Sequence, residues 1–488
     1  MRPNLLLITT DQHRGDCLSC EGHHALETPN LDALAERGYR FTRAYSAVPS
    51  STPARAAILT GMDQWHHGRL TMAGTDALEF PQTLPGGLAA AGYQTQAIGK
   101  MNFFPPRRLY GFHNMVLEEE GRASEGFECD YVAWFERNKD GDYGPRSHGL
   151  DLHSWVARPS HLPEHLHPTH WTANEAIRFI KNRDVTKPFF LWLSFSRPHS
   201  PYDPPQTYFD MYADTDIPKP PVGDWAKEFE QRIADMNAPF SRRPWAQTRR
   251  ALAAYYVNVT FADHQIGRFI GETNQFDPKL LANTLVIFTS DHGDMLGDHH
   301  HWRKAHAYEG SARVPFIVRP PESWNLAGNR TMEQLVELRD VLPTCWDAAG
   351  LKVPSTVDGA SVLPLLRDGQ ADWREFVQGE HTVSYLNDYG MQYITDGRRK
   401  YIWFHHTGRE RFFDLTADPQ ELRDLGNEPG ARTRVVEWRK RLADINERRG
   451  DPRGKQGELV VQQRALTLSP HYAKWRDAAR AGDFRHEK

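Results

Sequence analysis

Cysteine is scarce in this chain. The 488 residues include only four, Cys17, Cys20, Cys129 and Cys345. So few thiols in so long a chain argue against a disulfide framework. Cys17 and Cys20 form a CxxC pair, but without a second pair we interpret it as incidental rather than as a metal or redox site.

Long apolar runs and blocks of like charge are missing too. The run Leu5-Leu6-Leu7-Ile8 is too short for the core of a signal peptide and is soon followed by Asp11. No stretch approaches the ~20 apolar residues that a membrane helix needs. The net charge is −4 without a basic block, which gives no support for nucleic-acid binding. We therefore expect a cytoplasmic protein that binds neither membranes nor nucleic acid.

The composition that remains is that of a globular protein with a large core. Hydrophobic residues make up 39% and charged residues 25%. The length exceeds that of a single small domain. We predict one large domain over residues 1–366 and a smaller one over 367–488, where the sequence pattern changes.

Short apolar strands alternate with helices through the first of these domains. This alternation predicts an α/β fold, a large mixed and mostly parallel sheet with helices on both faces. The predicted strands are 5–9, 39–47, 93–98, 188–195, 285–289 and 313–318. Predicted helices begin near Thr28 and after the N-cap Ser51, the latter ending at Gly61, and others cover 84–91, 172–182, 245–270 and 337–349. Residues 104–169 show no such pattern, and we predict irregular excursions there.

The smaller domain is predicted to be a small antiparallel sheet with one helix. Residues 393–404 contain Asp396-Gly397 between two apolar runs, which is typical of a hairpin. A helix is expected over 435–448, and the polar tail is expected to lie on the surface.

The stretch from Ser51 to Gly61 combines a helix with a candidate anion site. Ser51 is a natural N-cap, Pro53 suits a first turn and Gly61 can end the helix. Ser51 and Arg55 lie four residues apart and so share one face, at a helix N-terminus that attracts anions. The alternative is a capped helix with a surface arginine.

Polar pairs follow two of the predicted strands directly. Asp11-Gln12 comes after 5–9, and Asp291-His292 comes after 285–289. Ligands of open α/β sheets bind beyond the carboxyl ends of strands, and these side chains offer oxygen and nitrogen to a cation. One such pair alone is also typical of a turn, whereas two make a metal site a more specific prediction.

The sequence resembles the sulfatase family. The pattern Ser51-x-Pro53-x-Arg55, ending in Leu59-x-Gly61, is similar to the signature in which a Cys or Ser is oxidised to formylglycine. The resemblance extends from Pro3-Asn4-Leu5 to Phe413-Asp414-Leu415. It implies an alkaline-phosphatase-like fold and a sulfate monoester as the substrate. It also implies Ser51 as the nucleophile precursor and one divalent cation on Asp11, Gln12, Asp291 and His292.

The resemblance assigns the remaining site residues one by one. Lys100 in Gly99-Lys100-Met101-Asn102 matches a lysine that reaches the nucleophile and the sulfate, and Arg55 and Lys304 match further cations around the sulfate. His199 matches a histidine that faces the leaving-group oxygen. Asn102 stands where the family usually has a histidine, and an amide cannot take a proton at neutral pH. The base for the second chemical step is therefore left open.

The implied cofactors and partners follow from the same resemblance. Calcium is favoured for the oxygen-rich site, and the imidazole makes Mn²⁺ the alternative. Formylglycine at Ser51 requires a serine-type radical maturase. A homo-oligomer is left open, and so is the alcohol, a sugar or an aryl group.

Two alternatives are kept. Phosphonate monoester and phosphodiester hydrolases of the same superfamily share the ligand pairs and lack the histidine at Asn102, but they usually carry Cys as the nucleophile and often replace the lysine at Lys100. A non-catalytic protein that binds sulfated sugars fits less well, because every charged position of the site except that of Asn102 is intact.

Overall fold

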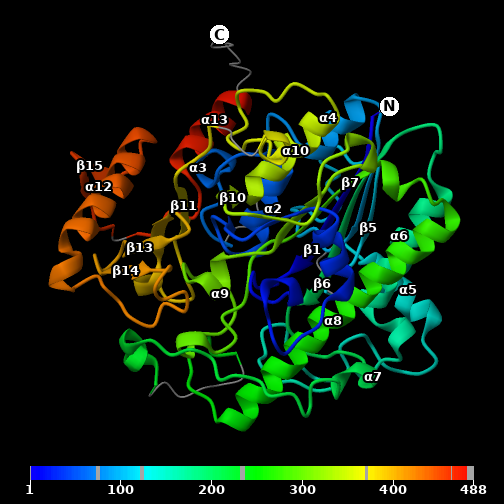
Figure 1. Ribbon diagram of the computed structural model, residues 1–488, viewed down its shortest axis with the longest axis horizontal. Helices are drawn as coiled ribbons and strands as arrows, with labels where there is room; N and C mark the ends of the chain where they lie inside the picture. The colour runs from blue at the N-terminus through cyan, green and yellow to red at the C-terminus, as the bar shows by residue number, and fades with distance from the viewer. Residues whose placement is uncertain are drawn as a thin grey trace.

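The computed structural model describes residues 2–72, 77–120, 126–230, 237–368, 372–462 and 464–480. Its centre is an eight-stranded sheet in the order β5-β4-β6-β1-β7-β8-β2-β9 (Figure 1). The five strands from β5 to β7 are parallel, and β8 is antiparallel to both of its neighbours. The predicted mixed, mostly parallel sheet is confirmed. The strands are β1 Asn4–Asp11, β2 Tyr39–Phe41, β4 Gln94–Gly99, β5 Asn114–Leu117, β6 Phe189–Pro198, β7 Thr284–Ser290, β8 Phe316–Arg319 and β9 Arg330–Met332.

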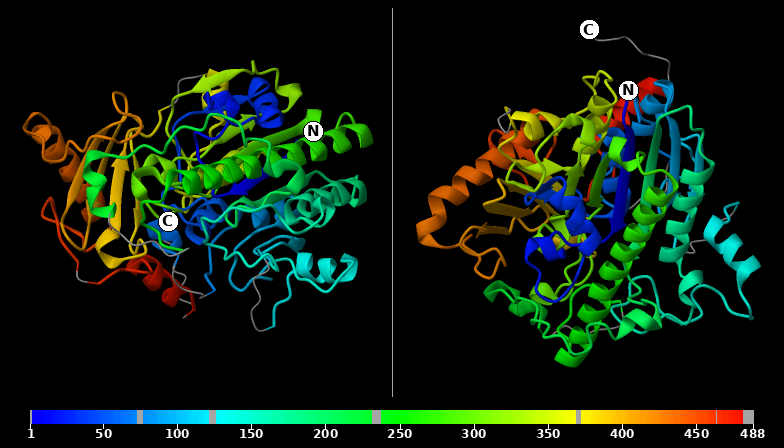
Figure 2. Two further views of the ribbon diagram at one scale, coloured as in Figure 1. Left: turned by 90° about the horizontal axis from the view of Figure 1, so that it is seen from below. Right: turned by 45° about the vertical axis from the view of Figure 1, so that its right-hand side comes forward.

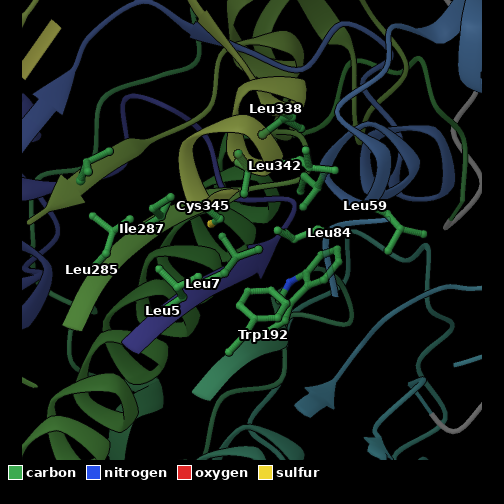
Figure 3. Packing of buried hydrophobic residues seen from close by; sticks show 14 of the residues in the cluster. Leu5, Leu7, Leu59, Leu84, Trp192, Leu285, Ile287, Leu338, Leu342 and Cys345 are labelled. Carbon is green, nitrogen blue, oxygen red and sulfur yellow. The ribbon is translucent and has the colours of Figure 1, made fainter. Parts of the chain in front are cut away.

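Both faces of this sheet are covered by helices. Alternate residues of a strand point to opposite faces, and every residue of β1 is buried. Leu5 and Leu7 pack with Trp192 and with the helices α2, α4 and α10 on one face (Figure 3). Leu6 and Ile8 pack with α1, α6 and α8 on the other. The helices are α1 Pro29–Glu36, α2 Ser51–Thr60, α4 Leu84–Ala90, α6 Pro168–Asn182, α8 Trp245–Phe276 and α10 Val341–Ala348.

The structure corrects the sequence prediction in two places. The strand expected over 39–47 is divided, because after β2 the chain leaves the large sheet and β3, Ala44–Tyr45, pairs with β10, Val336–Glu337. The irregular excursion over 104–169 contains the edge strand β5 and the helix α5, Asp130–Asn138. With only four residues and one neighbouring strand, β5 gives no apolar run that would reveal it.

A second sheet of four antiparallel strands lies to one side of the first (Figures 1 and 2). The hairpin is confirmed, with Gly397 in its turn at a φ of 74°. The helix α12, Arg432–Arg448, packs on this sheet through Trp438 and Leu442. This is the predicted small sheet with one helix, although the boundary at residue 366 stays a prediction. The strands are β11 Val377–His381, β12 Met391–Thr395, β13 Arg399–Phe404 and β14 Glu410–Asp414.

The chain then returns to the large domain. The helix α13, Pro470–Arg480, follows the expected surface course, and the hydroxyl of Tyr472 accepts a hydrogen bond from the backbone of Glu79. Residues 481–488 of the predicted tail lie outside the described part. Across the described ranges, every helix is too short or too polar to cross a membrane. The shorter elements are α3 Gln64–His67, α7 Gln206–Phe209, α9 Glu309–Ala312, α11 Leu363–Asp368, β15 Gly454–Lys455 and β16 Glu458–Leu459.

Candidate active site

The predicted site residues gather at the carboxyl edge of the large sheet. Neighbouring parallel strands end at the same edge, so residues far apart in sequence meet there. Asp11 ends β1, Asp291 follows β7, Lys100 follows β4 and His199 follows β6. All of these side chains are buried. The site therefore uses four adjacent strands, and α2 adds Ser51 and Arg55.

The helix α2 brings Ser51 to this edge, with one correction to the sequence prediction. The N-cap is Ser50, which has extended backbone angles and whose carbonyl accepts a hydrogen bond from the amide of Ala54. Ser51 is the first helical residue, so its hydroxyl is not used for capping. Its Oγ lies 3.1 Å from Nε2 of His292. Gly61 ends the helix at a φ of 69°, as predicted.

The four predicted metal ligands lie together. Ligand atoms of Asp11, Asp291 and His292 are all within 4.8 Å of one another. The buried Oδ1 of Asp11 and Oε1 of Gln12 accept no hydrogen bond from the described residues. Gln12 is oriented by its amide nitrogen, which donates to Oδ2 of Asp294 at 2.5 Å. Two carboxylates, the unpaired amide oxygen of Gln12 and the imidazole of His292 in a buried space fit one divalent cation.

The orientation and protonation of the His292 imidazole also suit the binding of a metal ion. Its Nδ1 lies 2.9 Å from the carbonyl oxygen of Gly293, which leaves Nε2 directed at the site. Burial, together with Lys304, lowers the pKa of His292 despite the nearby carboxylates. A neutral ring with a fixed tautomer is the form that binds a metal.

Cations surround the carboxylates from the other side. Nε of Arg55 is 3.1 Å from Oδ2 of Asp291, and Nζ of Lys100 lies against Oδ2 of Asp11. Burial opposes ionisation of Asp11, but Lys100 and the other nearby cations hold its pKa well below its usual range. The carboxylate therefore stays charged and available to a metal ion.

His199 and Lys304 form a contact of their own. Nζ of Lys304 lies 2.9 Å from Nε2 of His199, and Nδ1 of His199 lies 2.7 Å from the carbonyl oxygen of Ser200. Burial and the charge of Lys304 hold the pKa of His199 well below its usual range. Burial, together with Lys100, lowers the pKa of Lys304 to about 8. At neutral pH the imidazole is neutral and Lys304 carries the proton.

Asn102 lies beside the start of α2. Its amide nitrogen donates to Oγ1 of Thr52 at 3.3 Å, and its backbone nitrogen donates to Oε1 of Glu119 at 2.9 Å. The backbone of Asn102 has a φ of 55°, which asparagine tolerates better than most residues. The amide is thus held against Thr52, the residue that follows the nucleophile position.

Three site residues were not foreseen. Glu120 contacts Lys100 and His199, Asp294 orients Gln12, and His381 at the end of β11 places Nε2 3.1 Å from Oγ of Ser50. Asp294 follows the ligand pair Asp291-His292 by two residues, so its position was a usable signal. Glu120 lies in the excursion and His381 in the smaller domain, where no sequence pattern pointed to the site.

Comparison with known proteins gives one consistent answer. Residues 3–351 match the family described as Sulfatase, and residues 297–448 match the family described as N-sulphoglucosamine sulphohydrolase, C-terminal. The chain is 44% identical over 457 residues to an arylsulfatase of Clostridium perfringens, in a match that covers 91% of this chain and 94% of that protein. It is 30% identical over 443 residues to a choline-sulfatase of Rhizobium meliloti, covering 88% and 83%.

Among solved structures, a phosphonate monoester hydrolase of Agrobacterium radiobacter superposes with a TM-score of 0.77. It is 26% identical, and the match covers 92% of this chain and 96% of that one. The fold and the arrangement of layers are thus shared with an enzyme whose substrate is an ester of a different acid.

Proposed function

This chain belongs to the sulfatase family, and we propose that it hydrolyses a sulfate monoester through an oxidised Ser51 and one divalent cation. The observation that carries the proposal is the position of Ser51. Its Oγ lies 3.1 Å from Nε2 of His292 at the N-terminus of α2, and Arg55 of the same helix donates to Asp291 and to the carbonyl oxygen of Lys100. Sulfate ester hydrolysis follows from the family, and the roles of single residues are our assignment.

An ordinary serine would be a poor nucleophile in this position. Its close partner is His292, which belongs to the ligand set, and Arg55 cannot accept a proton. A hydrated formylglycine at residue 51 would supply one hydroxyl for attack on sulfur and a second hydroxyl for the later release of sulfate. A divalent cation held by Asp11, Gln12, Asp291 and His292 would polarise a sulfuryl oxygen and favour ionisation of that hydroxyl.

The remaining residues bind and orient the ester. Arg55, Lys100 and Lys304 place positive charge around the sulfate oxygens, where negative charge develops in the transition state. Lys304 holds a proton next to His199, and this pair would deliver it to the departing alcohol. Removing such a proton donor typically costs about 10²–10⁴ in rate. We propose Ca²⁺ as the ion with Mn²⁺ as the alternative, and a cytoplasmic setting with a serine-type radical maturase.

The alcohol is proposed to be an aryl or sugar alcohol. The relative at 44% identity is an arylsulfatase, which favours an aryl sulfate as the first substrate to test. The likeness to a phosphonate monoester hydrolase keeps phosphonate esters as the second candidate. The presence of Lys100 favours the sulfate ester, because phosphonate hydrolases of the superfamily often replace this lysine.

Production of the protein with and without a serine-type maturase tests the proposal. Peptide mass across Ser51 reports oxidation, and turnover of 4-nitrophenyl sulfate and phenyl phosphonate esters reports activity. We expect turnover of the sulfate only in material that carries the oxidised residue, while both preparations fold alike. Multiple turnover from protein whose peptide has the plain serine mass would contradict the mechanism, and a preference for the phosphonate would favour the second candidate.

A further inference from the structure

Glu120 is a buried carboxylate between Lys100 and His199, which lie on opposite sides of the proposed reaction. One of its oxygens, Oε2, lies 2.9 Å from Nζ of Lys100, which faces the nucleophile side through Asp11. The other, Oε1, lies 3.1 Å from Nδ1 of His199 on the leaving-group side. The two oxygens of one side chain therefore divide between the two halves of the site.

The backbone at this position is held in an uncommon conformation. Glu120 has a φ of 56°, in the left-handed region that glutamate rarely adopts. The amide of Glu120 donates to Oε1 of Glu118 at 2.7 Å, which fixes the turn. Such a conformation is strained for a residue with a Cβ and persists where the surroundings demand it. Here it directs the carboxylate inward, next to Lys100 and His199.

Glu120 contributes its negative charge to the site and is not needed to fix the tautomer of His199. The carbonyl oxygen of Ser200 already accepts from Nδ1 of His199 and fixes the tautomer. His199 nevertheless has the ammonium of Lys304 at its other nitrogen, and Lys100 adds a second cation close by. The carboxylate of Glu120 offsets the repulsion between the ammonium groups of Lys100 and Lys304. Both lysines and His199 can therefore keep their positions.

We propose that Glu120 is the positioning residue that couples the two sides of the site, holding Lys100 toward the nucleophile and His199 toward the leaving-group oxygen. This inference rests on the proposed function. It predicts that the loss of the carboxylate harms esters that need protonation more than esters that do not. A purely structural residue would harm both kinds equally.

The test compares phenyl sulfate, whose leaving group needs a proton, with 4-nitrophenyl sulfate, which needs little. In Glu120→Gln the NH₂ group of the new amide faces either Nζ of Lys100 or Nδ1 of His199. Both of these nitrogens donate hydrogen bonds, so one of the two contacts is lost. We expect kcat/KM for phenyl sulfate to fall by about 10–100-fold, as is typical when a supporting partner is removed, and the nitrophenyl ester to lose several-fold less. An equal loss on both esters would overturn the proposal.

A matched control and a double-mutant cycle make the test specific. Glu118→Gln changes a buried carboxylate two residues away that can still accept from the amide of Glu120, and we expect no difference between the two esters. In a His199→Asn background, Glu120→Gln should add no further difference between them. A difference in the control, or full additivity in the cycle, would count against the coupling.

Glu120→Asp replaces the first variant should glutamine at residue 120 prevent folding. The shorter side chain cannot reach both partners, so it should show the same difference between esters. No difference there would overturn the proposal. The proposed function fails separately, through wild-type enzyme that carries the oxidised Ser51 and turns over neither ester.

Discussion

At the scale of single residues, the buried carboxylate of Asp291 accepts hydrogen bonds from three different residues. Oδ1 accepts from the backbone amide of Gln12 at 3.1 Å and from the backbone amide of His292 at 3.0 Å. Oδ2 accepts from Nε of Arg55. These donors fix the direction in which the remaining lone pairs point. Asp291 is thus the centre of a hydrogen-bonding group as well as a proposed metal ligand.

We predict that Asp291→Ala abolishes metal binding and turnover together. Removal of a supporting partner alone costs about 10–100-fold in metal affinity, and loss of a ligand should exceed that range. Metal content measured by elemental mass spectrometry and turnover of nitrophenyl sulfate check this. The exposed carboxylate of Asp184 provides a control, since Asp184→Ala should keep both. Near wild-type metal content in Asp291→Ala would show that the ligand assignment is wrong.

Lys304 gives a prediction for pH. Burial and Lys100 lower its pKa to about 8, so the ammonium is present below that pH and is lost above it. In the proposed mechanism, the sulfate needs this charge and the leaving group needs this proton. We therefore predict that kcat/KM falls above about pH 8, approaching tenfold per pH unit, as for a single essential acid.

The variant Lys304→Arg isolates this titration. Arginine stays charged at every pH at which proteins are stable. Whatever its absolute rate, the variant should lack the decline of kcat/KM above about pH 8. A wild-type profile that stays level to about pH 10, near the ordinary pKa of lysine, would assign the proton to another group.

At the scale of elements, the helix α2 decides where the nucleophile lies. Its N-terminus presents Ser51, and its C-terminus is held at Gly61, whose carbonyl accepts from the amides of Asp358 and Gly359 at 3.0 and 2.9 Å. A Cβ on Gly61 would lie 2.8 Å from Cγ1 of Val357. The end of the helix is therefore fixed both by its conformation and by packing.

We predict that Gly61→Ala lowers the thermal midpoint and the activity together. The left-handed conformation costs an L-residue about 1–2 kcal/mol. The close approach to Val357 adds about 1–3 kcal/mol of overpacking. Gly350→Ala is the matched control, because Gly350 has a φ of 70° and a Cβ added there would meet no heavy atom of the described residues within 4 Å. An equal fall in both variants would mean that packing at Gly61 contributes nothing.

At the scale of the whole molecule, the smaller domain completes the site instead of standing apart from it. Glu380 on β11 accepts from Arg449 at 2.9 Å, from Arg453 at 2.5 Å and from Gln64 of α3 in the large domain at 3.3 Å. The next residue, His381, contacts the N-cap Ser50. The same strand thus joins the two domains and reaches the nucleophile helix.

We predict that Glu380→Ala weakens both stability and turnover. Breaking a buried ion pair typically costs about 3–5 kcal/mol, and the lower end applies here because Asp451 still pairs with both arginines. Thermal midpoint and kcat/KM of the folded fraction are the measurements. The exposed pair of Glu437 and Arg441 on α12 is the control, since such pairs contribute only about 0.3–0.5 kcal/mol. A Glu380→Ala protein as stable as Glu437→Ala would contradict the prediction.

The sequence by itself determined most of the large sheet and of its helices, apart from β5, β9 and α5, and the residues first proposed for the site. Buried strands are apolar runs, and Asp11 and Asp291 come at the ends of such runs, so local patterns place them on one sheet edge. The family resemblance supplied the residue roles. Ser51 was predicted one position off, as the cap, because a cap and a first helical residue look alike when two serines are adjacent.

Only the tertiary structure decided which further groups complete the site. Glu120 lies in a stretch without periodicity, and its contacts with Lys100 and His199 arise because distant strands end beside it. His381 belongs to the second sheet and reaches Ser50 because the two domains pack together. Local sequence determines what a strand or helix presents at its end, whereas the side chains that meet there depend on contacts between segments far apart in the chain.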